Sequence, residues 1–185
     1  MTAQRLPVVG MNKAVFLDRD GTLNLDTGYP KPEDLQLLPS VPEALKLLRD
    51  RGYLLILVTN QSGIGRGMLT LAEFWEFNDK LQSSLELKFD DIMFCPHAPW
   101  HNCLCRKPSP YLIEQAVVRY AVDKRSSWVI GDSKRDIEAG YRAGLRTALV
   151  LTGKTKEEDV RLWRVKPHLI GTSLIEVVRA ILDGS

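Results

Sequence analysis

The stretch Ala14-Val15-Phe16-Leu17-Asp18-Arg19-Asp20-Gly21-Thr22 runs from four apolar residues directly into two carboxylates and a glycine. The apolar run predicts a buried strand, and Gly21 predicts a turn where that strand ends. Because side chains alternate along a strand, Asp18 and Asp20 point to the same side if the extended geometry persists. Paired carboxylates repel each other, and Mg²⁺, which prefers oxygen ligands, relieves that repulsion. A solvated turn is the competing interpretation of this stretch taken alone.

Strands and helices alternate along the rest of the chain. We predict further strands at 53–58, 91–94, 127–130 and 147–151, and helices at 41–50, 70–88, 110–122, 135–143 and 173–182. This alternation is typical of βαβ units, so we expect a doubly wound α/β fold with a mostly parallel sheet covered on both faces. We expect a single domain over residues 1–185, with residues 1–11 as a loose extension. Ligands of such folds bind beyond the carboxyl ends of the strands.

Composition narrows the class of protein. The chain has 185 residues, of which 44% are hydrophobic and 26% charged, with a net charge of +2, and this excludes a disordered protein. No apolar run reaches the roughly 20 residues of a membrane helix, and the first twelve residues lack the apolar segment of a signal peptide. We therefore expect a cytoplasmic protein without a membrane partner. A monomer is a separate expectation that the composition does not decide. The charge balance is too weak to indicate nucleic acid.

Polar loops follow the other predicted strands. Thr59-Asn60-Gln61-Ser62 ends the second strand, and its hydroxyl, amide and backbone N–H groups are suited to phosphate oxygens. Arg106-Lys107-Pro108 precedes a helix, and Gly131-Asp132-Ser133 ends the fourth strand, where Asp132 can approach Asp18 across the sheet. Each loop also has an ordinary interpretation: a polar connection, a basic pair on the surface, or an N-cap.

These four loops, in this order, resemble the motifs of the haloacid-dehalogenase-like (HAD-like) superfamily of phosphohydrolases. The resemblance covers about residues 13–151. It implies that Asp18 is the nucleophile that forms an aspartyl-phosphate, and that Asp20 is the general acid and base. It also implies that Mg²⁺ is held by Asp18, by the backbone carbonyl of Asp20 and by Asp132.

The same resemblance assigns roles to the remaining loops. Thr59 holds the transferring phosphoryl group, with Asn60 beside it. Lys107 stabilises the phosphate, and Arg106 faces the substrate. Asp136, one helical turn after Asp132, supports the site through Lys134 or through a metal-bound water.

A second metal site is predicted between the third strand and the following helix. Cys95-Pro96-His97 and Cys103-Leu104-Cys105 supply three thiolates and an imidazole, which form a closed tetrahedral set for a structural Zn²⁺. Soft sulfur ligands argue against Mg²⁺ here. His101 competes with His97, and we prefer His97 because its spacing from Cys95 mirrors the spacing of the second pair. Zinc would order this loop and fix Arg106 and Lys107, which follow directly.

The cysteine pattern narrows the resemblance to the branch of heptose-1,7-bisphosphate 7-phosphatases and histidinol-phosphate phosphatases. Asp26-Thr27-Gly28-Tyr29 fits the substrate loop of the heptose enzymes, which implies roles for Asp26, Gly28 and Tyr29 in substrate binding. The resemblance implies Mg²⁺-dependent removal of the 7-phosphate in the synthesis of heptose precursors of surface polysaccharides. The interval from His97 to Cys103 is shorter than in some heptose enzymes, which leaves the preferred anomer open.

The choice among substrates depends on charge near the site. A second phosphate needs cations, and Arg66, Arg106 and Lys134 are available, which favours a sugar bisphosphate. Histidinol phosphate is the alternative, with Asp26 as the partner of its ammonium group. A nucleic-acid 3′-phosphatase and a non-catalytic zinc-stabilised interaction module are further alternatives. The segments 26–39 and 97–106 are the only sizeable insertions near the site, so we expect a minimal cap.

Overall fold

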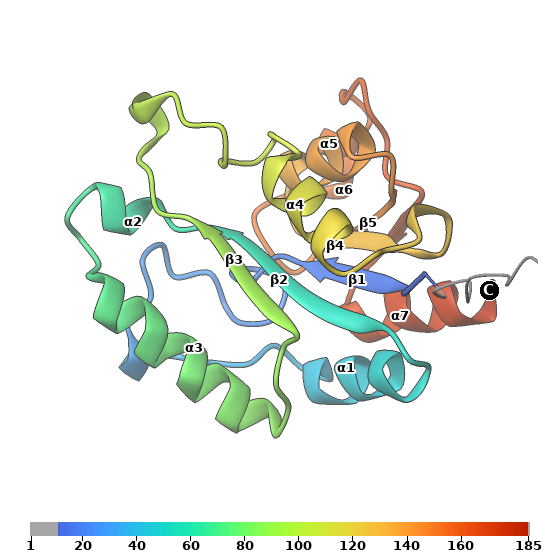
Figure 1. The fold of residues 1–185 in the computed structure, drawn as a ribbon, viewed down its shortest axis with the longest axis horizontal. Helices are drawn as coiled ribbons and strands as arrows, with labels where there is room; N and C mark the ends of the chain where they lie inside the picture. The colour runs from blue at the N-terminus through green and yellow to red at the C-terminus, as the bar shows by residue number, and fades with distance from the viewer. Residues whose placement is uncertain (1–10, 185) are drawn as a thin grey trace, which may run out of the picture.

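The computed structural model describes residues 11–184, which form a six-stranded parallel sheet in the order β3-β2-β1-β4-β5-β6 (Figure 1). The strands are β1 (Ala14–Leu17), β2 (Leu54–Asn60), β3 (Asp91–Cys95), β4 (Trp128–Gly131), β5 (Arg146–Val150) and β6 (Leu169–Gly171). All pairs between neighbouring strands are parallel. The predicted α/β fold with a parallel sheet is therefore confirmed.

The strand order changes direction beside β1. Leu17, the last residue of β1, pairs with Leu57 of β2 on one side and with Ile130 of β4 on the other. In doubly wound sheets, ligands bind beyond the carboxyl ends of the strands at such a switch point. Asp18 follows β1 and Asp132 follows β4, so the topology brings both carboxylates to this point.

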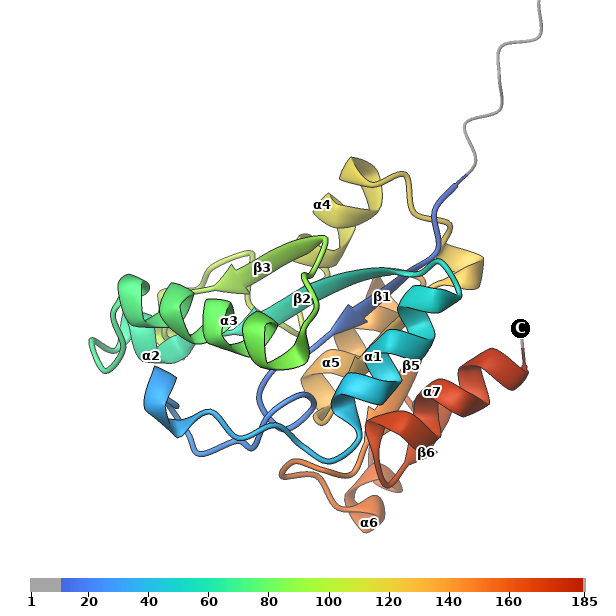
Figure 2. The same ribbon diagram turned by 90° about the horizontal axis from the view of Figure 1, so that it is seen from below.

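Helices cover both faces of the sheet. They are α1 (Val41–Asp50), α2 (Ser62–Gly65), α3 (Leu71–Leu85), α4 (Tyr111–Arg119), α5 (Lys134–Arg142), α6 (Glu157–Val160) and α7 (Leu174–Asp183). The two views in Figures 1 and 2 show α1, α3 and α7 on one face, and α4 and α5 on the other. The inner strands β1, β2, β4 and β5 are thus largely removed from water on both faces, whereas the edge strands β3 and β6 stay partly exposed.

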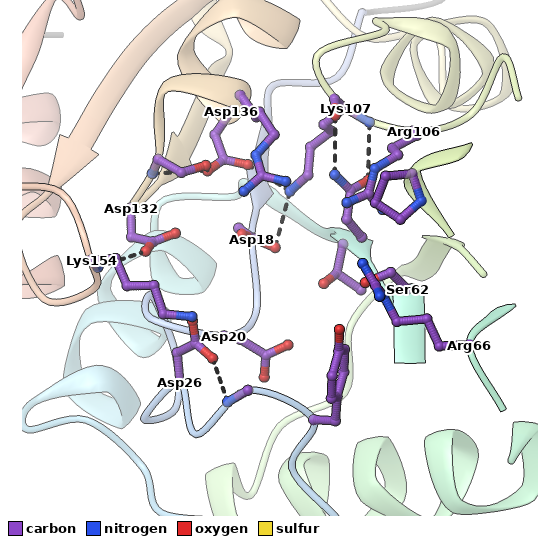
Figure 3. Close-up of a pocket in the computed structure, with 17 residues that line it drawn as sticks. Asp18, Asp20, Asp26, Ser62, Arg66, Arg106, Lys107, Asp132, Asp136 and Lys154 are labelled. Carbon is purple, nitrogen blue, oxygen red and sulfur yellow. Dashed lines mark hydrogen bonds and ion pairs between the residues drawn. The ribbon is translucent and has the colours of Figure 1, made fainter. Parts of the chain in front are cut away.

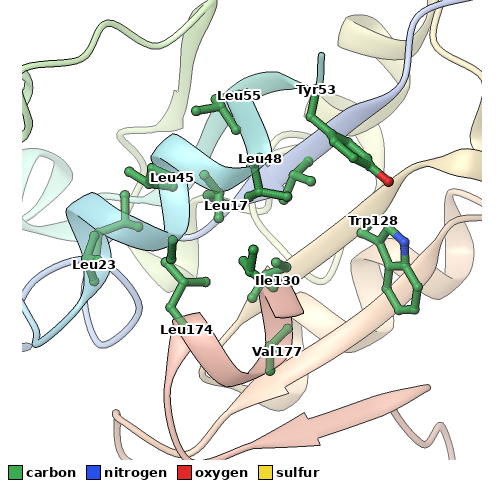
Figure 4. Packing of buried hydrophobic residues seen from close by; sticks show 14 of the residues in the cluster. Leu17, Leu23, Leu45, Leu48, Tyr53, Leu55, Trp128, Ile130, Leu174 and Val177 are labelled. Carbon is green, nitrogen blue, oxygen red and sulfur yellow. The ribbon is translucent and has the colours of Figure 1, made fainter. Parts of the chain in front are cut away.

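The side chains of the central strand β1 alternate between the two cores, one on each face of the sheet. Val15 and Leu17 belong to the core shared with α1 and α7 (Figure 4), whereas Ala14 and Phe16 belong to the core shared with α4 and α5. All four side chains are 0% exposed. Full burial of a large apolar side chain contributes about 1.5–3 kcal/mol. This packing therefore fixes the position of β1 in the sheet, and with it the position of Asp18, which follows the strand.

The structure corrects several boundaries and adds short elements. α2, α6 and β6 are absent from the prediction because segments of three or four residues are too short to show a period. α3 ends three residues before the predicted end, because Glu86 takes a left-handed conformation (φ 51°) that no glycine signals. α4 also ends early, since Ala121 has a φ of 46° and Val122 forms a bridge with Asn12.

Three expectations concern the chain as a whole. No helix within residues 11–184 has both the length and the apolar character needed to span a membrane. The predicted loose extension at residues 1–11 lies outside the described residues except for Met11. The assignment of a single domain stays a prediction.

Candidate active site

A cavity of about 420 Å³ opens at the carboxyl ends of the central strands (Figure 3). It brings together the predicted Asp18, Asp20 and Asp132 with most of the predicted substrate-binding residues, which are Asp26, Gly28, Tyr29, Thr59, Asn60, Ser62, Arg66, Arg106 and Lys107. Gln61 and Lys134, which were also predicted to serve the substrate, are not among the residues that line this cavity. Five loops that are far apart in sequence therefore meet at the switch point of the sheet.

Three carboxylates gather at one side of this cavity. Oxygen atoms of Asp18, Asp132 and Asp136 lie within 4.8 Å of one another. Burial raises the pKa of Asp18 to about 6; Lys107 opposes this shift, and the charge of Asp136 adds to it. Burial also raises the pKa of Asp132 to about 7, and the neighbouring Asp18 and Asp136 add to the rise. The cluster therefore holds more negative charge than its surroundings neutralise.

Glycines make room for Asp132. Gly21 has a φ of 82°, and a Cβ built on it would lie 2.6 Å from Oδ2 of Asp132. A Cβ on Gly153 would meet the same oxygen atom even more closely. Two reasons therefore favour glycine at position 21: the left-handed backbone conformation and the close approach of the Asp132 carboxylate.

The donor set fits a divalent cation. Asp18 and Asp132 offer oxygen ligands from neighbouring strand ends, which suits Mg²⁺, and a bound cation would offset the repulsion among the clustered carboxylates. Asp136 is engaged elsewhere: its carboxylate accepts from the backbone N–H of Ser133 at 3.0 Å and pairs with Lys107 Nζ at 2.6 Å. Asp136 therefore holds Lys107 and the start of α5 in place and is less available as a metal ligand.

Asp136 pairs with Lys107, whereas the prediction gave it Lys134 or a metal-bound water as its partner. Lys134 Nζ lies 3.7 Å from Glu138 on the outer face of α5, and Lys134 is not among the residues that line the described cavity. Arg135 lines it instead. The choice between two adjacent basic residues depends on where α5 begins, and the predicted start was one residue late.

Lys107 is the buried cation of the site. Its side chain is 4% exposed, and its ammonium group lies 3.0 Å from Asp18 Oδ1 and donates to the carbonyl oxygen of Val58 at 2.6 Å. Burial alone lowers the pKa of Lys107, but Asp136 and Asp18 outweigh it and raise the pKa. Asn60 exchanges two hydrogen bonds with the backbone of Lys107, at 3.0 and 3.1 Å, and so fixes it at the end of β2.

A second polar network surrounds Asp20. Arg19 donates to both carboxylate oxygens, at 3.1 and 3.0 Å, and Gln61 Nε2 donates to Oδ2 at 2.8 Å. The same Gln61 nitrogen donates to Thr59 Oγ1 at 3.0 Å. Gln61, predicted to bind substrate, thus links Thr59 to Asp20 behind the cavity. Arg19 was not predicted, because an arginine in a polar loop is ordinarily exposed.

The predicted zinc ligands form a separate cluster. Sγ of Cys95 lies 3.5 Å from Sγ of Cys103 and 3.7 Å from Nδ1 of His97, which lies 3.2 Å from Sγ of Cys105. A tetrahedral site with Zn–S bonds of about 2.3 Å separates neighbouring ligand atoms by similar distances. His101 Nδ1 instead accepts from the backbone N–H of Ala98 at 3.3 Å, which supports the preference for His97.

The cysteine loop supports two arginines of the cavity. The guanidinium of Arg66 lies 4.6 Å from the ring centroid of Trp100, and Arg106 donates to the carbonyl oxygen of His97 at 3.3 Å. The backbone N–H of Gly65 donates to the carbonyl oxygen of Pro96 at 2.7 Å, which ties α2 to this loop. Arg66 and Arg106 therefore lie on the side of the cavity opposite Asp132 (Figure 3).

The loop after β1 closes the remaining side. Asp26 Oδ1 accepts from the backbone N–H of Gly28 at 2.8 Å, and its other oxygen pairs with Lys154 at 2.7 Å. The ring of Tyr29 packs against Gly63 of α2, where an added Cβ would lie 2.8 Å from the ring. Lys154 was not predicted, since no strand-end motif marks the loop after β5.

Comparisons with known proteins agree with this geometry. The HAD-hydrolase-like family model matches residues 104–177. A D-glycero-beta-D-manno-heptose-1,7-bisphosphate 7-phosphatase of Helicobacter pylori (strain J99) is 46% identical over 150 residues, which cover 78% of this chain and 86% of that protein. The protein of the same name from Haemophilus ducreyi is 40% identical over 178 residues, covering 90% and 96% respectively.

One solved structure is similar to this chain in both fold and sequence. It is a D,D-heptose 1,7-bisphosphate phosphatase from B. bronchiseptica, complexed with magnesium and phosphate. The TM-score is 0.85 at 32% sequence identity, and the match covers 94% of this chain and 99% of that one. Since the match spans nearly all of both chains, the two proteins share the whole architecture and not only one motif.

Proposed function

Because the chain belongs to the HAD-like family of D-glycero-D-manno-heptose-1,7-bisphosphate 7-phosphatases, we propose that it hydrolyses the 7-phosphate ester of D-glycero-D-manno-heptose 1,7-bisphosphate. The observation that carries this proposal is the convergence of Asp18, Asp132 and Lys107 at one switch point, beside Asp20. A nucleophile, a cation and a proton carrier within one cavity are the parts that phosphoryl transfer needs.

In the first displacement, an oxygen of Asp18 attacks phosphorus and the bond from phosphorus to the sugar oxygen breaks. Asp20 gives its proton to that leaving oxygen, so the sugar departs as an alcohol. Lys107 lies 3.0 Å from Asp18 and holds positive charge next to the transferring group. Thr59 lies at the end of β2, where its hydroxyl can contact a phosphoryl oxygen.

In the second displacement, Asp20 removes a proton from water, and the water oxygen attacks phosphorus of the aspartyl-phosphate. The bond between phosphorus and Asp18 breaks, which releases phosphate and restores both carboxyl groups. Asp18, Asp132 and the backbone carbonyl of Asp20 would hold Mg²⁺, which, when bound, neutralises charge on the phosphoryl oxygens. The proximity of the Asp18 and Asp132 oxygens, within 4.8 Å of each other, supports this ligand set.

The charges around the cavity favour a bisphosphate over histidinol phosphate. Arg66 and Arg106 extend from the side of the cysteine loop and are suited to the phosphate that is not removed. Histidinol phosphate needs a free carboxylate for its ammonium group, but Asp26 already pairs with Lys154 at 2.7 Å. The sugar bisphosphate therefore remains the better substrate.

The cysteine loop has a structural role in this proposal. Zn²⁺ held by Cys95, His97, Cys103 and Cys105 would order the loop that carries Arg106 and that packs against Arg66. A single domain, a monomeric state and a cytoplasmic location, without nucleic-acid partners, complete the proposal as predictions.

The test is phosphate release in the presence of Mg²⁺. The substrates are both anomers of the heptose 1,7-bisphosphate, histidinol phosphate and a 3′-phosphorylated oligonucleotide, and Asp18→Asn is the control. We expect rapid release from the heptose, slow release from the others, and none with the variant. Equal rates on all substrates would remove the heptose assignment, and release that survives in Asp18→Asn would remove the nucleophile.

A further inference from the structure

Arg19 stands between the two aspartates of the first loop, yet its side chain turns away from solvent into the protein. It is 0% exposed and is the largest of the fully buried side chains among the described residues. From this placement we propose that Arg19 is a positioning residue: it holds Asp20 at the angle from which that carboxyl group reaches the leaving oxygen. This inference rests on the phosphatase activity proposed above.

The contacts of Asp20 support this role. Arg19 donates Nε to Oδ1 at 3.1 Å and Nη2 to Oδ2 at 3.0 Å, which is the two-pronged geometry of a guanidinium on a carboxylate. Gln61 Nε2 adds a bond to Oδ2 at 2.8 Å, and Asn24 Nδ2 adds one to Oδ1 at 2.9 Å. Arg19 thus supplies two of the four donors, and it alone grips both oxygens.

The guanidinium is itself fixed in place. It lies 4.2 Å from the ring centroid of Phe77 and 5.7 Å from that of Phe74, both on α3. Its Nη2 also donates to Gln61 Oε1 at 3.0 Å. A charge held by two rings and a buried amide has little freedom to rotate. Asp20 is therefore tied to a rigid helix, although it belongs to a loop.

Packing alone does not account for an arginine at this place. Arg19 Nη1 is buried and has no hydrogen-bond partner within residues 11–184. An unpaired buried donor opposes folding, and an apolar side chain of similar volume would fill the space without that cost. The two bonds to Asp20 are the feature that an apolar side chain cannot reproduce.

The donors also constrain how Asp20 moves its proton. An ionised carboxylate has about four acceptor positions, and four donors fill them. When Asp20 carries the proton that it gives to the leaving oxygen, that proton occupies one of these positions, so one donor must withdraw. Because Gln61 also holds Arg19 in place through its Oε1, the single bond from Asn24 is the one that exchanges. The two bonds from Arg19 stay in place and keep the carboxyl group of Asp20 oriented toward Asp18.

Esters with different leaving groups separate a positioning role from a structural one. An alkoxide leaves only with a proton from an acid, whereas p-nitrophenolate is a weak base and leaves without one. The constant kcat/KM covers the steps up to loss of the leaving group, so it reports the acid step for each ester. Both the heptose bisphosphate and p-nitrophenyl phosphate are measured, with enzyme in excess where turnover is slow.

We expect Arg19→Met to lower kcat/KM on the order of 100-fold for the heptose bisphosphate and by less than about fivefold for p-nitrophenyl phosphate, as for a displaced general acid. Arg19→Lys keeps the positive charge but loses the two-pronged contact with the carboxylate. It should therefore also lower kcat/KM more for the heptose bisphosphate than for p-nitrophenyl phosphate, but by a smaller factor. Leu81→Ala, a core change one turn further along α3, is the control for loss of stability and should lower both constants alike.

The outcomes are distinct. If the wild-type protein hydrolyses neither ester, the proposed function is wrong, and the role of Arg19 falls with it. If the wild type is active but both arginine variants lower the two constants by the same factor, as Leu81→Ala does, Arg19 is only structural. Should Arg19→Met not fold, Arg19→Lys decides the question by the same ratio.

Discussion

Replacing Lys107 with methionine removes the cation of the carboxylate cluster and keeps the length of the side chain. Lys107 Nζ lies 2.6 Å from Asp136 and 3.0 Å from Asp18, and its side chain is 4% exposed. The variant leaves the buried Asp136 facing the half-buried Asp18, with Asp132 close by. We expect this change to lower the free energy of unfolding substantially, because Asp136 is 1% exposed and loses its buried cation.

The magnitude follows from these distances. At an effective dielectric constant of about 20, each attraction is worth about 6 kcal/mol before desolvation. Desolvation of the three groups offsets most of this, and removal of one partner from a buried pair costs about 3–5 kcal/mol net. With a urea m-value of about 2 kcal/mol per molar, the unfolding midpoint should fall by about 2 M.

The assay is urea unfolding followed by circular dichroism at pH 8 in EDTA, so that metal binding does not contribute. Lys154→Met is the matched control: Lys154 pairs with Asp26 at 2.7 Å, but its side chain is 75% exposed. Exposed pairs contribute about 0–1 kcal/mol, so its midpoint should hardly move. Equal unfolding midpoints for the two variants would refute the reasoning that burial makes the ion pairs of Lys107 important for stability.

Three further predictions follow from the two metal sites and the nucleophile. Asp20→Asn, given p-nitrophenyl phosphate, should release a burst of p-nitrophenol and retain a phosphoryl group on the peptide with Asp18, seen by mass spectrometry after acid quench; phosphate on another peptide would contradict the mechanism. The purified protein should contain about one zinc per chain, and Cys103→Ser should lose it and raise KM for the bisphosphate; an unchanged zinc content would exclude this ligand set. In EDTA, the free energy of unfolding should fall as pH rises from about 4 to 7. The pKa values of Asp18 (about 6) and Asp132 (about 7) in the native state exceed the ordinary aspartate value of 3.8, so the native state binds more protons than the unfolded state in this window. Asp132→Asn should flatten this slope in thermal melts, and an equal slope in both proteins would speak against these shifts.

The parts of the site that strand ends deliver could be predicted from sequence. Asp18 and Asp132 each follow an apolar run, and the carboxyl ends of parallel strands meet at one edge of a sheet. The cysteine cluster was predictable for another reason, since the spacing from Cys95 to Cys105 is itself the signal for a zinc site. In both cases local sequence carries the geometry.

Contacts that depend on packing could not be predicted. Arg19 reads as a loop residue, and its burial follows only from where α3 places Phe77. Lys154 reaches the cavity because the loop after β5 folds back toward Asp26. The exchange of Lys134 for Arg135 depends on a single residue at the start of α5, which is within the ordinary uncertainty of helix boundaries.

The most direct test of the central claim is a ³¹P NMR time course of D-glycero-D-manno-heptose 1,7-bisphosphate with the protein and Mg²⁺. The account predicts that the resonance of the 7-phosphate ester disappears, that inorganic phosphate appears at the same rate, and that the 1-phosphate resonance stays. The spectrum should not change with Asp18→Asn. Loss of the 1-phosphate, or an unchanged spectrum with the wild-type protein, would contradict it.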